Sequence, residues 1–461
     1  MVSYLPITIV PNETFHQSET NIYISYSLAK YWKIEPLDTI QLCLGVSTIS
    51  VEVKMADIEK DVLHINPVLL KNIQVPQKES RFLSQYCHKD KCIYLGPIIG
   101  LMTELEEDSV SKEPDFRSVH SFCEELHHVI ASIGGLFYVF HPRDFGTEST
   151  NCYYFDDGEW VKGSFGLPDV IYNRVHSRRL EASSSFNKIL EQIHHLNIPI
   201  FNAKFLSKIE VHEMLFSEEH LHPYLPDTST FTEQTLSTFL KKYPSVFIKP
   251  IHGSQGRNII RLDLTEDGIQ VVTSSGKSKD SMTFKSADPF IKWFKPRMNK
   301  STYLIQQTIP LLTLEDRHLD FRVLCHKNYQ ERWRVTSVVA RVSAEEQFVS
   351  NVARGGETMK PLKPLTLLFG KEIAVQQVAL IKELALETAN IVSQSAPGNY
   401  GEFGIDIGVD HEGKMWIIEV NSKPSKSFEE HDVKIRPSSK AIIEYSTALA
   451  FNKRDSPPLS N

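Results

Sequence analysis

The chain has 461 residues, of which 41% are hydrophobic and 23% charged, so it can form two or three domains with sizeable cores. Its formal net charge of -7 at pH 7 does not indicate a general nucleic-acid-binding protein, so a partner with phosphates would need a local basic patch. No apolar run approaches the roughly 18 residues of a membrane span. The start, MVSYLPITIVPNETF, lacks the pattern of a signal peptide, so we expect a cytoplasmic protein.

Six cysteines are spread along the chain, too few and too dispersed for a disulfide-stabilised scaffold. Cys87, His88 and Cys92 form the one local cluster, in the stretch CHKDKC. Its spacing matches none of the usual zinc-ligand pairs, and no second pair follows it. We therefore expect reduced thiols rather than a metal site, which agrees with a cytoplasmic location.

Residues 1–95 are predicted to form a β-rich accessory domain. The runs ITIV, NIYISYS and IQLCLGVSTISVEVK are rich in β-branched and aromatic residues, and no pattern among them indicates chemistry. Glycines and a proline then punctuate YLGPIIGLMT, and the stretch after it is acidic. Residues 96–117 are therefore predicted to be a linker.

A small α/β domain is predicted over residues 118–200. Apolar residues between Phe122 and Ile133 fall on one helical face, and strand-like runs then alternate with helical spacing. The strand LPDVIYN leads into a basic loop with Arg174, Arg178 and Arg179. These arginines could bind an anionic substrate, and a solvated basic loop is the alternative.

Two lysines and a glycine-containing loop indicate phosphate binding. Lys208 lies near the start of a predicted helix, and Lys249 ends the apolar strand SVFIKP. Glycines let backbone N–H groups approach phosphate oxygens, and lysine supplies a point charge. The loop lacks the spacing of a P-loop and precedes a strand, so on its own a plain hairpin is the alternative. Its members are Gly253, Ser254, Gln255 and Gly256.

The next strands carry polar residues at their ends and on their faces. TYLIQQTIPL is a predicted apolar strand with Gln306 and Gln307 near its end, where backbone groups could meet an adenine edge. DFRVLCH and ERWRVTSVVARVS are predicted to pair and to carry Arg322 and Arg341. Arginines in a buried sheet usually have a carboxylate or a ligand phosphate as partner. The loop SNVARGGE follows, with Asn351, Arg354, Gly355 and Gly356.

The stretch GEFGIDIGVDHEGKMWIIEVNSKPS, residues 401–425, predicts two strands joined by a turn. Side chains alternate along a strand, so Glu419 and Asn421 share a face, and pairing can bring Asp406 beside them. Two carboxylates and an amide oxygen are hard ligands that suit Mg²⁺, which fills its remaining positions with substrate phosphates and water. An exposed hairpin with solvated polar residues is the alternative.

Taken in order, these motifs resemble those of ATP-grasp enzymes, and more closely those of the YheC/YheD-type family, described as endospore coat-associated proteins of spore-forming bacteria. The resemblance spans nearly the whole chain. It implies an α+β fold in which two lobes clamp ATP, after a small α/β pre-ATP-grasp domain and an N-terminal β-rich domain. The matching stretches are LPDVIYNRVHSR, FNAKFLSKIEVHEML, YLIQQTIPL, DFRVL, SNVARGGE and IDIGVD…EGKMWIIEVNSKP.

The resemblance also implies a role for each candidate residue. ATP would be held by Lys208, Lys249, Gly253, Ser254, Gln255, Gly256, Gln306 and Gln307. Mg²⁺ or Mn²⁺ would be held by Asp406, Glu419 and Asn421. Arg322 and Arg341 would be catalytic. The substrate would be contacted by Arg174, Arg178, Asn351, Arg354, Gly355 and Gly356.

We therefore predict an ATP-dependent ligase that joins a carboxylate to an amine through an acyl phosphate, linked to the forming spore coat. Coat proteins would dock on the accessory domain. The alternatives are an ATP-binding structural component of the coat without turnover, and an ATP-grasp kinase. The predicted boundaries are 1–95, linker 96–117, pre-ATP-grasp-like 118–200, ATP-grasp 201–452 and a disordered tail 453–461.

Overall fold

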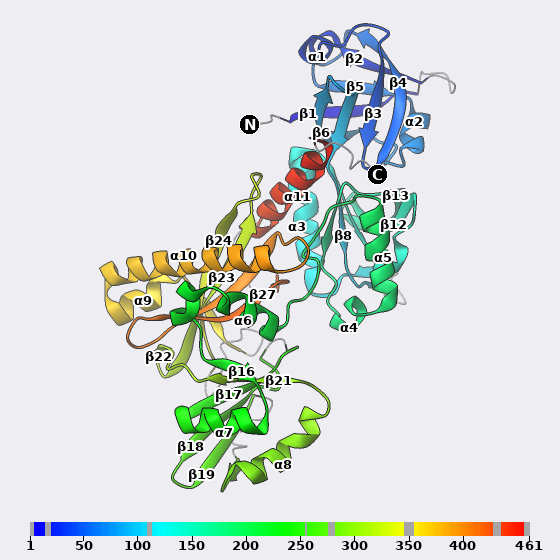
Figure 1. Cartoon of the computed structure of the whole chain (residues 1–461). Helices are drawn as coiled ribbons and strands as arrows, with labels where there is room; N and C mark the ends of the chain where they lie inside the picture. Colours follow the sequence, from blue (N-terminus) through cyan, green and yellow to red (C-terminus); the bar gives the residue numbers. More distant parts are fainter. Residues whose placement is uncertain are drawn as a thin grey trace.

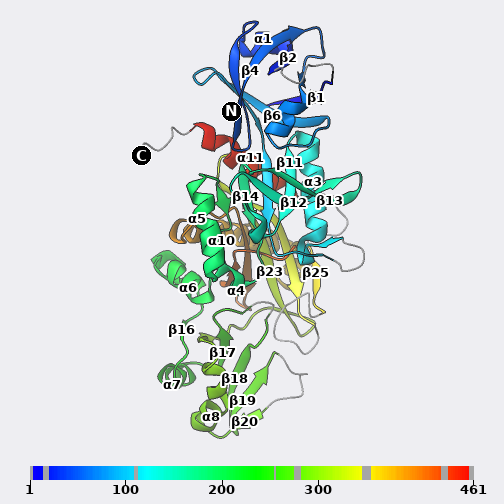
Figure 2. The same cartoon turned by 90° about the vertical axis from the view of Figure 1, so that its right-hand side faces the viewer.

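The computed structural model describes residues 4–13, 20–107, 113–253, 256–274, 282–344, 355–426 and 435–455. Four sheet-based units follow one another along a long axis, with the first at one end (Figures 1 and 2). Helices and strands are mixed throughout, which confirms the α+β class. Within these ranges no helix is both long enough and apolar enough to cross a membrane.

The first unit is a closed barrel with strand order β1-β5-β2-β4-β3-β7-β6. Side chains alternate between the interior and the exterior along each strand, and residues such as Ile7, Ile9 and Leu42 fill the interior. Helix α1 begins after Ser25, whose side chain accepts from the Leu28 N–H. The elements are β1 (Leu5–Pro11), β2 (Asn21–Ser25), α1 (Tyr26–Trp32), β3 (Thr39–Leu44), β4 (Ser47–Ala56), β5 (Val62–Ile65), α2 (Pro67–Asn72), β6 (Ser80–Cys87) and β7 (Cys92–Gly96).

The second unit is a six-stranded sheet with order β13-β12-β11-β8-β14-β15. Helix α3 packs against β11. It also contacts α11, the last helix of the chain (Figure 1). The elements are β8 (Ile98–Met102), α3 (His120–Ile133), β11 (Leu136–Phe140), β12 (Ser149–Asp156), β13 (Glu159–Gly166), β14 (Val170–Asn173), α4 (Arg178–Glu181), α5 (Ser184–His195), β15 (Ile200–Phe201), the 3₁₀ helices η1 (Arg117–Val119) and η2 (Pro142–Asp144), and a separate pair, β9 (Glu106–Glu107) with β10 (Pro114–Asp115).

The predicted linker over 96–117 is wrong at its start, because strand β8 lies in the middle of this sheet, between β11 and β14. All five of its residues are buried, so it shows no alternation that would identify it as a strand. Gly100 is not a turn residue there. A Cβ at Gly100 would lie 2.9 Å from the Phe140 ring, so glycine allows close packing inside the sheet.

The third unit is a six-stranded antiparallel sheet with order β16-β21-β17-β18-β19-β20, whose one face packs against α7 and α8. Phe231, Leu236, Phe290 and Phe294 form the core between the helices and the sheet. The elements are β16 (Thr228–Thr230), α7 (Glu233–Lys242), β17 (Ser245–Pro250), β18 (Ile260–Thr265), β19 (Gly268–Thr273), β20 (Met282–Phe284), α8 (Ala287–Met298) and β21 (Tyr303–Gln307).

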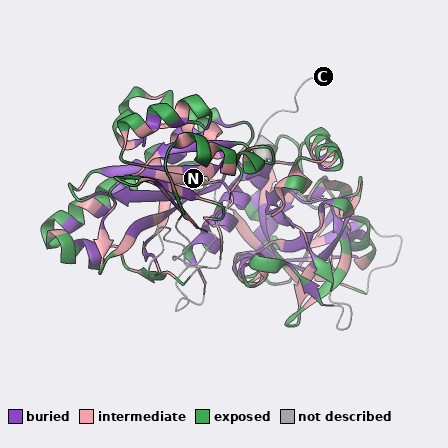
Figure 3. Cartoon of the chain, turned by 90° about the horizontal axis from the view of Figure 1, so that it is seen from below, coloured by how far each residue is buried: buried purple, intermediate pink, exposed green. Residues whose placement is uncertain are grey.

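The fourth unit is a sheet with order β25-β24-β23-β26-β27, and helix α10 packs on one of its faces. Phe403, Ile405 and Ile407 point to α10, so the other face of β26 carries the even-numbered residues. In Figure 3 these strands are largely buried and the outer helix surfaces exposed. The elements are α6 (Lys208–Phe216), η3 (Glu219–Tyr224), β22 (Thr313–Leu314), β23 (Arg317–Lys327), β24 (Trp333–Val342), β25 (Glu357–Met359), α9 (Leu362–Phe369), α10 (Lys371–Ser395), β26 (Glu402–Val409), β27 (Met415–Asn421) and α11 (Pro437–Asp455).

A fully buried carboxylate, Glu402 on β26, joins the second and fourth units. It accepts from Arg174 Nη1 at 2.9 Å and from Asn202 Nδ2 at 3.1 Å, and it pairs with Lys426. The Tyr172 hydroxyl donates to it, and His326 Nε2 lies 3.4 Å away. Burial alone would raise the pKa of Glu402, but Lys426, His326 and Arg174 hold that pKa well below its usual value.

We predict that Glu402→Gln, which keeps the size but removes the charge, lowers the free energy of unfolding by about 3–5 kcal/mol, because Arg174 and Lys426 remain buried without a counter-charge. The pKa of Glu402 is lowered on folding, so its contribution is present above about pH 4.3 and is lost as the pH falls below that. Urea unfolding at several pH values measures this, with exposed Glu266→Gln as the control. A loss below 1 kcal/mol at pH 7 would contradict it.

Candidate functional site

The third and fourth sheets present their polar faces to the same region, and each carries part of the site. On β17, Val246 and Ile248 point to the core, so Lys249 and Phe247 point away from it. Lys249 Nζ donates to Gln306 Oε1 of β21 at 2.6 Å. Cross-strand pairing thus holds the ammonium group on the polar face of the third sheet.

Lys208 reaches the site from the start of α6. Ser207 caps this helix and forms a capping box with Glu210, which fixes where the first helical residue lies. Lys208 Nζ is 3.3 Å from the Gly253 carbonyl oxygen and forms an ion pair with Glu419. One lysine therefore links the glycine loop after β17 to strand β27.

Burial and, to a smaller extent, the positive charge of Lys208 together lower the pKa of Lys249 to about 8. Glu419 acts in the opposite direction but does not compensate. An anionic ligand beside Lys249 would offset this cost, and phosphate binding there stays a prediction.

The face of the fourth sheet carries a ladder of charges. Asp406 on β26 lies directly opposite Arg322 on β23 and forms a two-point ion pair with it, with Arg322 Nη2 2.9 Å from Oδ2. Arg341 on β24 lies 3.1 Å from Asp406 and donates to both oxygens of Asp320 at 2.6 and 2.7 Å. Burial would raise the pKa of Asp406, but the two arginines hold it below its usual value.

A β-bulge brings Glu419 onto this face. Asp406 pairs with Glu419, but the next residue, Ile407, pairs with Ile417, so Ile418 is an extra residue in β27. Ile417 and Val420 consequently both lie in the core, which strict alternation does not allow. Asn421 lies opposite Gly404, so it shares the polar face with Glu419. The sequence predicts this shared face, but it gives no signal for the bulge.

The three candidate metal ligands offer oxygen atoms that suit a hard divalent cation. Asp406 and Glu419 supply carboxylates, and no hydrogen bond of the Asn421 side chain is found with the described residues. Within the described residues no group of three or more His, Cys, Asp and Glu side chains could hold a metal by itself. The set therefore fits Mg²⁺ only with oxygens from a ligand.

Gln306 and Gln307 point to opposite faces of β21. Gln306 meets Lys249 on the polar face, whereas Gln307 Oε1 accepts from the Asp227 N–H at 3.3 Å at the outer edge of the sheet. A direct contact of the Gln307 side chain with a ligand beside Lys249 is therefore not supported. Its backbone N–H donates to the Asp227 carbonyl oxygen at 2.9 Å, so this group is already paired within the sheet.

The two candidate arginines of the second unit differ. Arg174 is 3% exposed and bound by Glu402 and the Pro424 carbonyl oxygen, so it holds the units together rather than binding substrate. Arg178 begins α4 and lies 4.5 Å from the centre of the Phe205 ring, and we find no carboxylate paired with it among the described residues. Burial lowers the pKa of Arg178, and the carboxylates of Glu181, Glu419 and Glu210 act in the opposite direction.

The remaining candidates lie in the two glycine-containing loops. Gly256 has a φ of 65° and Gly355 a φ of 88°, both in the region that favours glycine. Ser254, Gln255, Asn351 and Arg354 lie outside the described residues. Asp320 and Lys423 were not predicted. Alternation along β23 places Asp320 on the same face as Arg322, so the sequence could have identified Asp320. No sequence pattern indicates that Lys423 pairs with Glu181 on α4.

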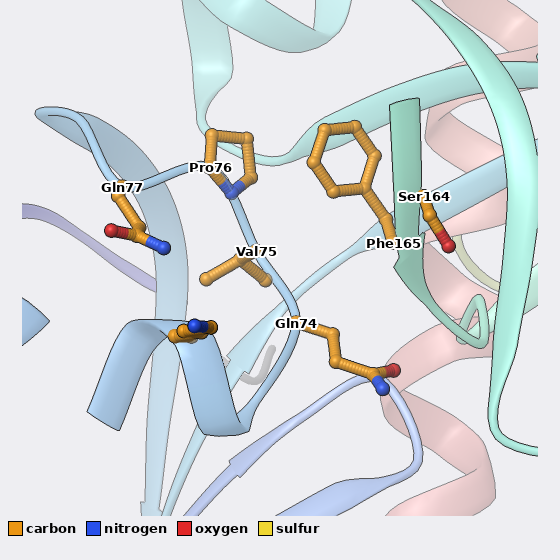
Figure 4. A pocket seen from close by; sticks show the side chains of 7 residues that line it. Gln74, Val75, Pro76, Gln77, Ser164 and Phe165 are labelled. Atoms are coloured by element: carbon orange, nitrogen blue, oxygen red, sulfur yellow. The ribbon is translucent and has the colours of Figure 1, made fainter. Parts of the chain in front are cut away.

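Two cavities lie outside the charged faces of the third and fourth sheets. Figure 4 shows one of about 330 Å³ between the chain after α2 and strand β13, lined by Val75, Pro76 and Phe165. A second, of about 560 Å³, lies beside the outer edge of β16 and includes Gln307 and Trp416. Neither contains Lys208, Lys249 or Asp406, so the charged faces remain the candidate site.

Comparisons with known proteins find a matching family and several similar chains. Residues 197–449 match the sequence family described as YheC/D like ATP-grasp. The chain is 30% identical over 351 residues to the endospore coat-associated protein YheD of Bacillus subtilis (strain 168), covering 74% of this chain and 76% of YheD. It is 25% identical over 318 residues to YheC of the same organism, covering 66% and 85%. The D-alanine-D-alanine ligase from Coxiella burnetii is similar in structure, with TM-score 0.46, 11% identity and coverage of 78% and 95%.

We predict that Lys208→Met raises the pKa of Lys249 above its value of about 8, because it removes a neighbouring positive charge and frees Glu419. NMR titration of the lysine side-chain carbons measures this, with exposed Lys292→Met on α8 as the control. A pKa of Lys249 that stays constant or falls in Lys208→Met would show that the two ammonium groups do not interact.

Proposed function

The chain belongs to the YheC/D-like ATP-grasp family, and from that premise we propose that it is an ATP- and Mg²⁺-dependent ligase. It would join a carboxylate to an amine through an acyl phosphate. The family membership confirms the ATP-grasp fold and the family resemblance expected from the sequence. The activity, its metal and its residues are our proposal.

The convergence of Lys208 and Lys249 opposite the Asp406–Glu419 face carries this proposal. Lys208 contacts both the glycine loop and Glu419, so a single side chain spans the space between the two sheets. A triphosphate would pair with both ammonium groups and would offset the cost of charging the buried Lys249. The two lobes would thus be held together by the ligand's phosphates.

Asp406, Glu419 and Asn421 would hold Mg²⁺ or Mn²⁺, whose charge neutralises that of the phosphate oxygens. Arg322 and Arg341 would donate to the oxygens of the transferring phosphoryl group or of the substrate carboxylate. Arg178, with Gly355 and Gly356, would border the acceptor site. No Ser, Cys or His nucleophile is required.

The proposed chemistry has two steps. A substrate carboxylate oxygen attacks the γ-phosphorus of ATP, and ADP leaves. The amine nitrogen then attacks the acyl carbon, phosphate leaves and the amine loses a proton. Positioning and charge neutralisation supply most of the catalysis of the first step, which is what two lysines and two arginines provide.

The curated relatives are named endospore coat-associated, and we propose the same association for this chain. It would act in the cytoplasm beside the forming coat, and the β-barrel of residues 1–95 would serve as the docking module. The carboxylate and amine would be small molecules or peptides. The family names leave open a coat component that binds ATP without turnover.

We predict that Lys249→Met weakens ATP binding by about 1.5–3 kcal/mol, which is roughly 10- to 150-fold, because a charge-assisted contact to phosphate is lost. Adenosine, which lacks phosphates, should lose less than about twofold. Calorimetry with both ligands measures the difference, and Lys292→Met serves as the control. Equal losses for ATP and adenosine would exclude a phosphate contact.

We expect the chain to release ADP from Mg-ATP only when a carboxylate and an amine are both present, in a screen of amino acids, dipeptides and spore-envelope acids. Glu419→Gln should reduce this release about 100-fold at saturating ATP, because it removes the charge of a proposed metal ligand. Glu419 is partly exposed, so we expect the variant to fold. Nucleotide binding without ADP release from any pair would favour the structural role. A stable phosphorylated product without an amine would favour a kinase.

A further inference from the structure

Arg178 differs from every other buried or half-buried arginine of the described chain, because it has no carboxylate partner. None of its N–H donors forms a hydrogen bond or an ion pair with another described residue. A guanidinium group stays charged, and one that is partly withdrawn from water is normally paired with an anion. The arginines in similar surroundings that do form an ion pair are Arg174, Arg261, Arg317, Arg322, Arg334, Arg341 and Arg436.

The carboxylates around Arg178 are already bound to other groups. Three of them act on its charge, and each forms an ion pair with a lysine. The pairs are Glu181 with Lys423, Glu210 with Lys204, and Glu419 with Lys208. The guanidinium group of Arg178 can therefore bind an external anion without breaking an ion pair of its own.

Helix α4, which begins with Arg178, is fixed by contacts at both of its ends. Glu181 at its last position pairs with Lys423, where both side chains are at most 8% exposed, and accepts from the Phe205 N–H at 3.0 Å. The carboxylate of Glu104 accepts two backbone N–H groups of the loop that leads into the helix, at 2.8 and 2.9 Å. The guanidinium carbon of Arg178 lies 4.5 Å from the centre of the Phe205 ring. A cation that is already oriented loses less entropy when it binds a ligand.

The position of Arg178 is close to the proposed phosphate site. Phe205, whose ring it contacts, lies three residues before Lys208 in the chain. Burial and the charges of Arg178 and Lys208 lower the pKa of His252, which directly precedes the glycine loop. Such charge effects fade beyond about 10 Å in a salt solution. Figures 1 and 2 both show α4 at the end of the second unit that is nearer the third unit.

The second unit contributes none of the residues proposed to hold ATP or the metal, so Arg178 reaches the site from a different direction. A guanidinium group binds the oxygens of a carboxylate or a phosphate through two parallel hydrogen bonds. We propose that Arg178 binds an anionic group of a substrate other than the carboxylate that reacts, for which Arg322 and Arg341 are the proposed partners. The enzyme would then select a substrate with an additional carboxylate or phosphate. This inference rests on the proposed ligase function.

Substrate pairs that differ by one anionic group test this inference in the ADP-release assay. The pairs are glutamate with glutamine, aspartate with asparagine, and phosphoserine with serine. We expect kcat/KM to be at least about tenfold higher for the anionic member, because it gains a charge-assisted contact with Arg178. A preference in the first two pairs indicates a carboxylate, and one in the third pair a phosphate. Arg178→Gln should remove the preference and change the affinity for ATP less than about twofold.

Arg179→Gln is the matched control, because it removes the same charge from the next residue, which is exposed. It should keep the preference. Loss of the preference in both variants would trace it to the general positive charge of α4 and overturn the inference. A tenfold loss of ATP affinity in Arg178→Gln would place this residue on the nucleotide phosphates, which also overturns it. Thermal unfolding checks that both variants are folded.

Calorimetry with the same pairs, on the chain saturated with Mg²⁺ and a non-hydrolysable ATP analogue, separates this inference from the ligase proposal. A binding preference that Arg178→Gln abolishes, without ADP release from any pair, would support the anion site and contradict the ligase. ADP release without discrimination within any pair would support the ligase and overturn the anion site. A chain that discriminates within no pair in either measurement also overturns the inference.

Discussion

The architecture depends on Glu402, a carboxylate with no exposed surface that lies between two sheets. A buried charge is tolerated only when it is paired, and here Arg174 and Lys426 supply the counter-charges from different parts of the chain. Arg174 follows β14 of the second unit, and Glu402 begins β26 of the fourth. The orientation of one unit on the other is thus restricted to the one in which these charges meet.

The same strand connects this pairing to the candidate site. Glu402 and Asp406 are four residues apart on β26, so they point to the same face. His326 pairs with Glu402 along β23, and Arg322 pairs with Asp406 on the same two strands. A shift of β26 that separated Glu402 from Arg174 would also displace Asp406. The charge cluster that joins the units therefore also positions the carboxylate proposed to hold the metal.

Within the site, Lys208, Arg322 and Arg341 each form an ion pair with a carboxylate. Lys208 pairs with Glu419 and Arg322 with Asp406, so a phosphate ligand would compete with these carboxylates for the cations. That exchange keeps the site near neutral and avoids the cost of holding several like charges together. Lys249 Nζ donates to Gln306 Oε1, and burial together with the positive charge of Lys208 lowers the pKa of Lys249.

Alternation and spacing in the sequence were sufficient to place Asp406, Glu419 and Asn421 on one face, because the β period is strict over a few residues. They could not identify the bulge at Ile418, which depends on cross-strand register, nor β8, whose buried run shows no alternation. Local pattern likewise predicts the same candidate role for Arg174 and Arg178. Burial separates them, since the partner of Arg174 lies 228 positions away and no local pattern predicts it. Local pattern therefore identifies chemistry on a strand, whereas the contacts that orient the strand come from distant parts of the chain.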